Sequence, residues 1–220
     1  ATGLVLGAFW GMGPVWAQRA GLGTGAVAAF MAATILGGAL LQWPIGRWSD
    51  RHDRRAVLTA TATVAALAAA ACAVLTPLSA SAVIGVAALY GGCAFALYSL
   101  GVATVTDAVP PGRLVEATRA LLLVNGLGSA LGPVTVGYVM GAARPGAFFV
   151  YAAAVLAGLA VYGWRARHAA DAVSVDAQGH FTVLARTSPA ALELHPEGPA
   201  DAPAAEPETA DADADADADA

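Results

Sequence analysis

The sequence predicts an all-α membrane protein with six transmembrane helices and an acidic C-terminal tail, and three observations lead to this fold class. Hydrophobic residues make up 58% of the 220 residues and charged residues 12%, whereas soluble domains carry roughly a quarter charged residues. Apolar stretches of spanning length recur without the two-residue alternation of a membrane barrel. Beyond residue 168, the sequence becomes polar and acidic.

The six expected helices are apolar stretches that each approach the roughly 20 residues needed to cross a bilayer. Arg, Asp and Pro are concentrated between them. We expect the helices at residues 1–17, 25–43, 56–76, 80–106, 118–141 and 147–164. The lipid bilayer is therefore a partner that the sequence implies.

Charge predicts the orientation of these helices. Residues 1–168 carry ten Arg and four acidic residues, a net charge of +6, whereas residues 169–220 carry one Arg and twelve acidic residues, a net charge of −11. Because successive helices cross the membrane in opposite directions, alternate connections lie on the same side of the membrane. One side carries Arg47, Arg51, Arg54, Arg55, Arg113, Arg119, Arg165 and Arg167. The other side carries Arg19 and Arg144. The positive-inside rule makes the first side, and with it the C-terminus, cytoplasmic.

The chain divides into three parts. Residues 1–168 form the six-helix bundle, and residues 169–195 form a short cytoplasmic segment whose alternating apolar residues around Gly179 are consistent with a hairpin. Residues 196–220 end in an Asp-Ala repeat that cannot bury a core and should be disordered. The first residue is Ala inside an apolar run, so we expect the chain to start partway through a longer protein.

The densest charge in the apolar part lies between the second and third expected helices, where residues 46–55 read GRWSDRHDRR. An Asp followed by arginines at a helix end can form a charge-assisted network with guanidinium groups and helix termini. This pattern predicts a ten-residue cytoplasmic gating loop. An ordinary positive-inside loop would need only the arginines.

The loop resembles the signature of the major facilitator superfamily, which reads Gly, three residues, Asp, Arg or Lys, any residue, Gly, Arg, and Arg or Lys. The matching residues are Gly46, Asp50, Arg51, Arg54 and Arg55. Asp53 stands in place of the second Gly. Because Asp tolerates a left-handed backbone, this departure should leave the turn possible.

The resemblance covers about residues 1–195 and implies the C-terminal six-helix half of a twelve-helix transporter. Residues 106–119, together with residues 122–133, look like the second half of a bacterial branch of drug and sugar efflux carriers. The resemblance implies alternating access, with the N-terminal six-helix half of the same protein as partner. It also implies that Asp50 pairs with a nearby Arg and faces a helix of that other half; the simpler alternative is that Asp50 caps a helix.

Polar residues gather on four of the six helices. The third and sixth helices are largely Ala, Val and Leu, whereas the others carry polar side chains that should face protein or water rather than lipid. The candidates for a solute cavity are Asn125, Tyr98, Gln42 and Tyr90. Hydrogen bonding between helices is the alternative role for Asn125 and Tyr98.

Glycines spaced by four occur on two helices. In lipid, such small residues let helices approach closely. The first helix carries Gly3, Gly7 and Gly11, for which we expect a packing role. The fifth helix carries Gly128, Gly132, Pro133 and Gly137, which favour a packing face with a proline pivot or, equally, an ordinary kinked helix.

The function that these features favour is secondary transport of a small organic solute across the bacterial cytoplasmic (inner) membrane. An intramembrane hydrolase would need a base beside Ser99 or Ser129, and no expected helix carries His or a carboxylate at its middle. Cys72 and Cys93 lie in apolar runs without ligand spacing, so we expect no metal, no cofactor and no enzymatic activity.

No part of the sequence points to nucleic acid. A coupling carboxylate, if the carrier has one, is expected in the other half. The alternative function is that of a non-transporting membrane receptor or scaffold whose acidic tail recruits a partner.

Overall fold

The computed structural model describes residues 1–142 and 146–166, and within these ranges the chain forms six α-helices, one short 3-10 turn and no strand. The all-α prediction is therefore confirmed for the described residues. The helices are α1 (Thr2–Arg19), α2 (Thr24–Ser49), α3 (Arg54–Leu75), α4 (Ala80–Ala108), α5 (Leu114–Ala142) and α6 (Ala147–Ala166), and the 3-10 turn η1 (Pro111–Arg113) precedes α5.

The chain separates into two compact units, residues 1–183 and 184–220. The second unit lies outside the described residues. The hairpin expected in residues 169–195 and the disorder expected in residues 196–220 lie outside them as well, so both stay predictions.

Five of the described helices, α2 to α6, are long and apolar enough to cross a membrane. This bears out the prediction of a multi-pass membrane protein. The first helix, α1, has 18 residues and is not among the five, so its expected passage through the membrane stays a prediction.

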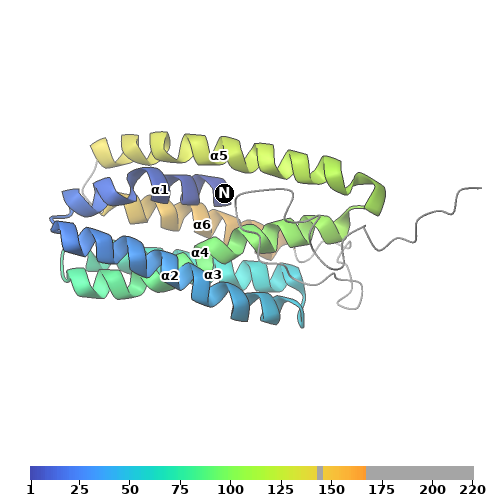
Figure 1. Ribbon diagram of the computed structural model, residues 1–220, viewed down its shortest axis with the longest axis horizontal. Helices are drawn as coiled ribbons and strands as arrows, with labels where there is room; N and C mark the ends of the chain where they lie inside the picture. Colours follow the sequence, from blue (N-terminus) through green and yellow to red (C-terminus); the bar gives the residue numbers. More distant parts are fainter. Residues whose placement is uncertain (143–145, 167–220) are drawn as a thin grey trace, which may run out of the picture. The chain divides into compact units, whose positions relative to one another are not determined.

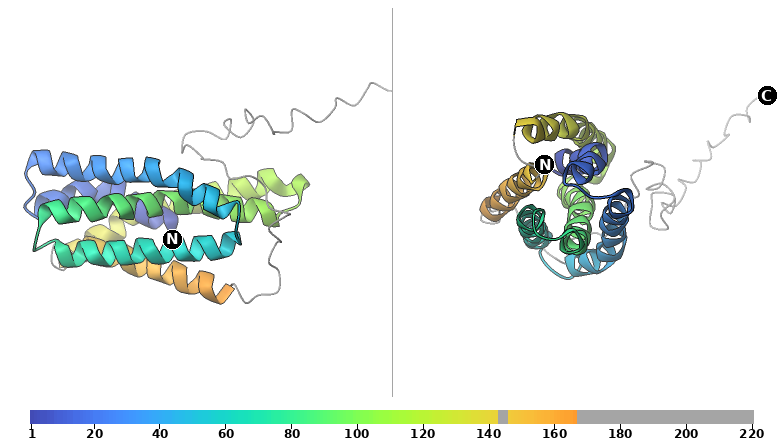
Figure 2. Two further views of the ribbon diagram at one scale, coloured as in Figure 1. Left: turned by 90° about the horizontal axis from the view of Figure 1, so that it is seen from below. Right: turned by 90° about the vertical axis from the view of Figure 1, so that its left-hand side faces the viewer.

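The helices pack in neighbouring pairs, α1 with α5, α2 with α4, and α3 with both α4 and α6 (Figures 1 and 2). Aromatic side chains fill the core at the end of the bundle where α1 meets α2. Trp16 is fully buried, and its ring centroid lies 4.7 Å from that of Phe149 and 5.0 Å from that of Phe30. These rings link α1, α2 and α6.

Glycines set the closest helix contacts. A methyl group added at Gly7 of α1 would overlap the backbone of Ser129 on α5, and one added at Gly37 of α2 would overlap the backbone of Ala88 on α4. Where two helix backbones approach this closely, the helices are held by dispersion and backbone contacts instead of interdigitating side chains. The packing role expected for the α1 glycines agrees with this geometry.

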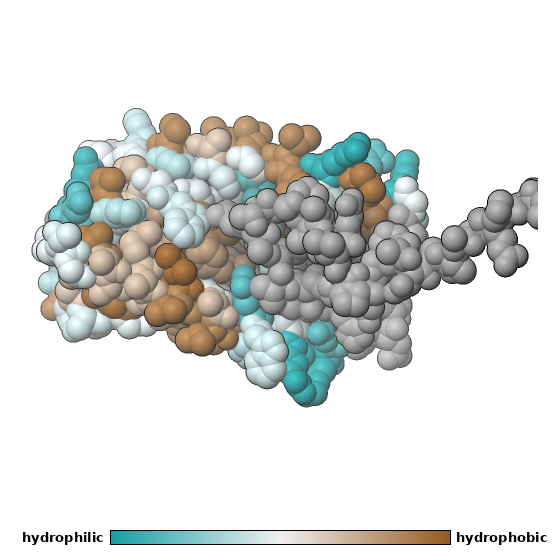
Figure 3. Space-filling model, in the orientation of Figure 1, coloured by the Kyte–Doolittle hydropathy of each residue, from teal (hydrophilic) through white to brown (hydrophobic). Residues whose placement is uncertain are grey.

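Polar and charged residues gather at the ends of the bundle. In Figure 3 hydrophilic colour lies at both ends of the bundle, including the α4–α5 connection and the α2–α3 turn at one end, with much of the apolar colour between the two ends. The α2–α3 turn, the start of α5 and the end of α6 lie at the same end of the bundle (Figure 2), and we refer to it as the charged end because it carries most of the arginines.

Candidate functional site

The charged segment 46–55 is not one loop. Gly46 to Ser49 form the last turn of α2, and Arg54 and Arg55 begin α3, which leaves only four residues between the helices. The amide of Asp50 still donates to the Gly46 carbonyl at 3.0 Å. The ten-residue loop was therefore wrong: nothing in the Gly46–Ser49 turn removes a backbone donor, so the α-helical hydrogen bonds continue.

Asp53 does not adopt the left-handed conformation that its replacement of Gly suggested. Its φ is −54°, and no described residue other than Gly has a positive φ. Asp53 is instead the N-cap of α3, where its carboxylate accepts a hydrogen bond from the Arg55 amide at 3.0 Å. The carboxylate satisfies a backbone donor that the first helical turn leaves without an acceptor.

Arg54 is the centre of an ion-pair network that joins three helices. Its Nη1 donates to Oδ2 of Asp107 at 2.6 Å, and its Nη2 donates to Oδ1 of Asp50 at 3.3 Å. The Arg54 side chain is 3% exposed, that of Asp107 9% and that of Asp50 28%. A guanidinium this buried needs such partners, because an uncompensated buried charge costs several kcal/mol.

The pairing of Asp107 with Arg54 was not predicted from the sequence. Asp107 lies in the last turn of α4, 53 positions from Arg54. One signal could have predicted this pairing. The α2–α3 and α4–α5 connections lie at the same end of a bundle whose helices alternate in direction. Asp107 is the acidic residue that directly follows the expected helix at residues 80–106, so it lies at the same end as Arg54. Opposite charges at one membrane interface tend to pair.

The other motif residues have separate environments. Gly46 is buried in α2, and Arg51 is exposed in the turn. Arg47 is also exposed, with its guanidinium carbon 5.6 Å from the centre of the Trp43 ring, a cation–π geometry. Arg55 is half-buried and lines a cavity.

The packing face predicted for α5 consists of three glycines and one proline, and all four contact α1. A methyl group on Gly132 would overlap the carbonyl oxygen of Leu4, and one on Gly128 would lie 3.1 Å from the Leu4 amide nitrogen. Pro133 lies against Gly11, and Gly137 lies near Met12. This arrangement is a continuous packing face; whether Pro133 also acts as a pivot stays a proposal.

A cavity of about 640 Å³ is lined by residues of α1, α3, α4, α5 and α6. Two of the four candidate solute residues, Asn125 and Tyr98, line it together. Asn125 Oδ1 is buried without a hydrogen-bond partner among the described residues. Gln42 and Tyr90 are not in the lining: Gln42 is half-buried on α2, and Tyr90 is 1% exposed with its ring against Phe149.

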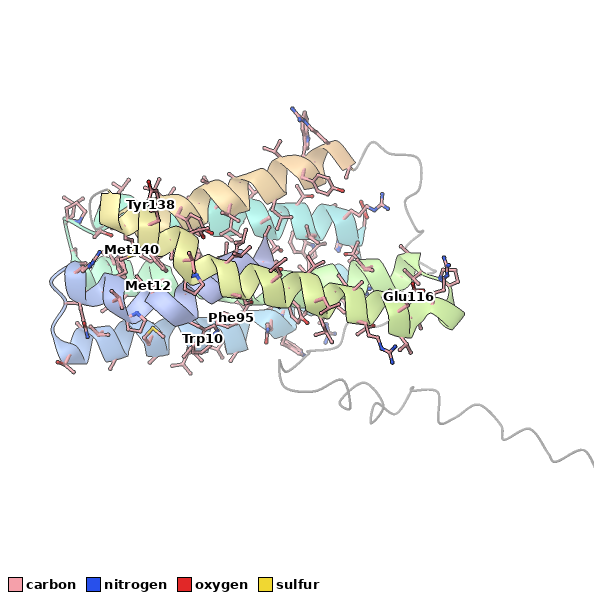
Figure 4. All side chains as sticks on the ribbon, turned by 90° about the horizontal axis from the view of Figure 1, so that it is seen from above. Trp10, Met12, Phe95, Glu116, Tyr138 and Met140 are labelled. Carbon is pink, nitrogen blue, oxygen red and sulfur yellow. The ribbon has the colours of Figure 1, made fainter. Side chains whose placement is uncertain are left out.

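An aromatic pair on another face was not anticipated. Trp10 of α1 is 45% exposed, and its ring centroid lies 6.1 Å from that of Phe95 on α4 in an edge-to-face arrangement. Figure 4 shows both rings beside α5, between Glu116 near the first turn of that helix and Tyr138 near its other end. Isolated aromatics within apolar helices have no spacing signal that would single them out.

Two long helices expose broad apolar faces. On α2 the exposed fractions are 59% for Leu36 and 72% for Leu40, and on α5 they are 75% for Leu123 and 80% for Tyr138. Of the five spans, α5 and α2 are the least buried within the bundle. Such faces need lipid or another apolar surface against them.

No group of three or more His, Cys, Asp or Glu side chains that could hold a metal ion occurs within residues 1–142 and 146–166. Cys72 and Cys93 are buried and unbridged. The polar cluster at the charged end is held by the ion pairs of Arg54 with Asp50 and Asp107.

The family model of the Major Facilitator Superfamily matches residues 1–195. The chain belongs to the Major Facilitator Superfamily. The resemblance carried by residues 46–55 is thereby confirmed, and membrane transport is the activity class of the family.

Similar proteins of the superfamily include an uncharacterized MFS-type transporter, YcaD, in Escherichia coli. The YcaD sequences of strains E24377A, HS and K12 DH10B are each 33% identical to this chain over 132 residues, which is 60% of the chain and 33% of the relative. The match thus spans about a third of the length of these superfamily relatives.

Proposed function

We propose that this chain is one six-helix half of a secondary transporter that moves a small organic solute across the bacterial cytoplasmic membrane by alternating access. Superfamily membership and five spanning helices support a transporter. The observation that carries the mechanism is the Asp50–Arg54–Asp107 network at the charged end. A receptor or scaffold with a partner-recruiting tail is the less favoured alternative.

Gating would depend on the difference between the two carboxylates. Asp107 is nearly buried and holds Arg54 at 2.6 Å, which fixes the start of α3 to the end of α4. Asp50 is more exposed and its contact to Arg54 is longer, 3.3 Å. Asp50 is therefore the carboxylate better placed to leave Arg54 and bind a group of the other six-helix half when the cytoplasmic side closes.

The other six-helix half would cover the apolar faces of α2 and α5. Leu40 and Trp43 on α2, and Leu123 and Leu127 on α5, are each at least 64% exposed. Two such bundles could rock against each other about a midplane solute site. The same faces would be the surface through which Asp50 meets its partner.

Solute contact is proposed for polar residues at mid-height of the bundle. Asn125 and Tyr98, which line the same cavity, are the first candidates. Gln42 would contribute from α2. Tyr90 would take part only in a state that uncovers its hydroxyl, since it is 1% exposed here.

The charged end would face the cytoplasm. It carries Arg47 and Arg51 near the α2–α3 turn, Arg113 and Arg119 near the start of α5, and Arg165 at the end of α6. The C-terminus would then be cytoplasmic as well. A reporter fused after residue 168 should give a cytoplasmic signal, and a periplasmic signal would reverse this orientation.

The gating role is tested with Asp50→Asn in the full-length transporter that contains this chain. Loss of a charge-assisted contact worth about 1.5–3 kcal/mol in one state should favour the inward-open state by about tenfold or more, because 1.4 kcal/mol is a factor of ten. We expect turnover per inserted molecule to fall accordingly while abundance stays near wild type. Flux is measured in vesicles with a panel of fluorescent amphipathic dyes and labelled sugars.

The matched control is Asp53→Asn, which removes one carboxylate from the same turn but keeps an N-cap, since Asn caps as well as Asp. Its turnover should equal that of the wild type. Equal turnover for the Asp50 and Asp53 variants would reject gating by Asp50. No flux of any solute from the wild-type protein would favour the scaffold.

A further inference from the structure

The middle of α4 is open to the outside at two aromatic side chains. Of residues 90–100, Phe95 and Tyr98 are partly exposed and all the others are buried. Trp10 of α1 lies beside Phe95, with 6.1 Å between the ring centroids, and is 45% exposed. Figure 4 shows the Trp10 and Phe95 side chains next to each other beside α5. The accessible surface at this place is therefore aromatic.

The two rings are held in place by their neighbours. Phe9 is 1% exposed, and its ring centroid lies 5.4 Å from that of Trp10 and 6.0 Å from that of Phe95. All of these contacts are edge-to-face, the arrangement that aromatic rings prefer. A methyl group added at Gly38 would lie 2.9 Å from the Phe95 ring, so this ring rests on the backbone of α2. Rings fixed in this way lose little conformational entropy when a ligand binds.

The aromatic pair lies at mid-depth of the bundle. Phe95 is 15 residues after the first residue of α4 and 13 before the last, which is about 20 Å from either end at 1.5 Å per residue. Trp side chains that face lipid prefer the membrane interfaces, and Trp43, Trp48 and Trp164 lie near helix ends. A solute therefore explains an exposed Trp at mid-depth better than lipid tails do.

The pair also lies between α2 and α5, the helices whose apolar faces the other six-helix half would cover. Phe95 contacts Gly38 of α2, and Gly11, the residue after Trp10, lies against Pro133 of α5. Two halves that rock about a midplane site would meet around these rings.

The described residues place no charge at this depth. In residues 1–142 and 146–166, every Asp, Glu, Arg and His lies between helices or within the first or last two turns of one. Two uncharged polar side chains lie one turn away, Gln42 after Gly38 on α2 and Tyr98 after Phe95 on α4. An anion would find no counter-charge here and would meet the negative faces of the rings.

We propose that Trp10 and Phe95 form the solute platform of this half, and that its solute is a flat aromatic cation. The solute ring would stack on the exposed indole of Trp10, and the ring faces would stabilise its positive charge. Gln42 and Tyr98 would accept hydrogen bonds from its amino groups. This inference rests on the proposed transport function, because it names the substrate class of the same site.

The test uses ethidium as the flat aromatic cation, tetrabutylammonium as a saturated cation of the same charge, and labelled lactose as the sugar. Binding is measured by equilibrium dialysis with the full-length transporter in lipid nanodiscs, and empty nanodiscs give the background. Trp10→Leu removes the exposed ring, and Trp10→Phe keeps a smaller one. Trp48→Leu is the matched control, since Trp48 is 44% exposed and lies in the last turn of α2.

We expect Trp10→Leu to raise the Kd for ethidium about tenfold, because a desolvated cation–π contact is lost. Trp10→Phe should give an intermediate Kd, and Trp48→Leu should bind ethidium as the wild type does. Tetrabutylammonium should bind the wild type more weakly than ethidium, and Trp10→Leu should change its Kd less. Should Trp10→Leu not fold, the intermediate value for Trp10→Phe carries the test.

An unchanged Kd for ethidium in both Trp10 variants, or an equal loss in Trp48→Leu, would overturn the inference. Absence of saturable ethidium binding to the wild type would overturn it too and leave the rings to lipid. Binding and flux of lactose without ethidium binding would reject the aromatic solute while transport stands. Ethidium binding that depends on Trp10, without flux of any solute, would support the aromatic site and reject transport.

Discussion

The charged end and the α1–α5 contact are held together by opposite means. At the charged end, one guanidinium and two carboxylates connect three helices through two contacts of 2.6 and 3.3 Å. Along α1 and α5, by contrast, glycines bring the backbones together over three successive turns without an ion pair among the described residues.

Under the proposed gating mechanism, this difference would separate a region that switches from one that does not. An ion pair can exchange one partner for another at a similar distance, which is one way in which a protein changes between two arrangements. A backbone contact between glycines has no alternative partner and becomes weaker with any displacement, because dispersion falls steeply with distance. We therefore expect α1 and α5 to move as one body while the α2–α3 turn changes partners.

The largest effect is expected from Arg54→Gln. This change leaves Asp107, 9% exposed, beside Asp50 without the guanidinium between them. Breaking a buried pair from one side costs about 3–5 kcal/mol. The free energy of unfolding, measured by SDS titration in mixed micelles, should fall by this amount.

Arg51→Gln is the control for Arg54→Gln, since Arg51 belongs to the same turn but is exposed. Substitutions at exposed sites usually change stability by less than about 0.5 kcal/mol. If the Arg51 and Arg54 variants lose equal stability, the network does not hold the charged end together.

A smaller effect is expected from Gly132→Ala, which tests the glycine contact. The added methyl group would overlap the carbonyl oxygen of Leu4 and lie 2.7 Å from the Ala8 amide nitrogen. Overpacking of this kind costs about 1–3 kcal/mol. Because backbone atoms surround the site, no side-chain rotation can relieve the overlap.

Gly126→Ala is the matched control for Gly132→Ala on the same helix, since nothing lies within 4 Å of the methyl group that it would add. Ala is favoured over Gly inside a helix by about 0.5–1 kcal/mol, so this variant should be neutral or more stable. Equal stability of the two variants would mean that the α1–α5 contact tolerates displacement, and the two regions would no longer differ in the way described.

The comparison also explains which features were predictable. Helix positions follow from apolar length, and the described helices begin and end within a few residues of the expected ranges at most boundaries. The clearest exception is α2, which continues from the expected end at residue 43 to Ser49. Arg47 and Trp48 are compatible with a helix at an interface, so charge alone did not mark the helix end.

The candidate site was harder to predict, because it depends on contacts between distant residues. The Arg54–Asp107 pair spans 53 positions and requires the ends of α3 and α4 to meet. Tyr90 was expected beside solute because it is polar, yet Phe149 packs on its ring and its side chain is 1% exposed. A hydroxyl predicts that a residue faces protein or water, but it does not predict which of the two.

The smallest loss of stability is expected from replacing the N-cap residues of α3 and α4. The first cap lies at the charged end and the second at the opposite end, so the two variants compare the two ends directly. Asp53 accepts a hydrogen bond from the Arg55 amide at 3.0 Å at the start of α3, and Ser79 accepts one from the Ala82 amide at 3.3 Å at the start of α4. Replacing an N-cap by Ala costs typically about 1 kcal/mol. Asp53→Ala should cost more than Ser79→Ala, because its hydrogen bond is shorter and its negative charge lies at the positive end of a helix dipole. Raising the salt concentration should narrow the difference in unfolding free energy between the two variants, since only the Asp53 contribution is screened. A loss at Asp53→Ala as large as that of Arg54→Gln would instead mean that the cap and the ion-pair network act as one unit.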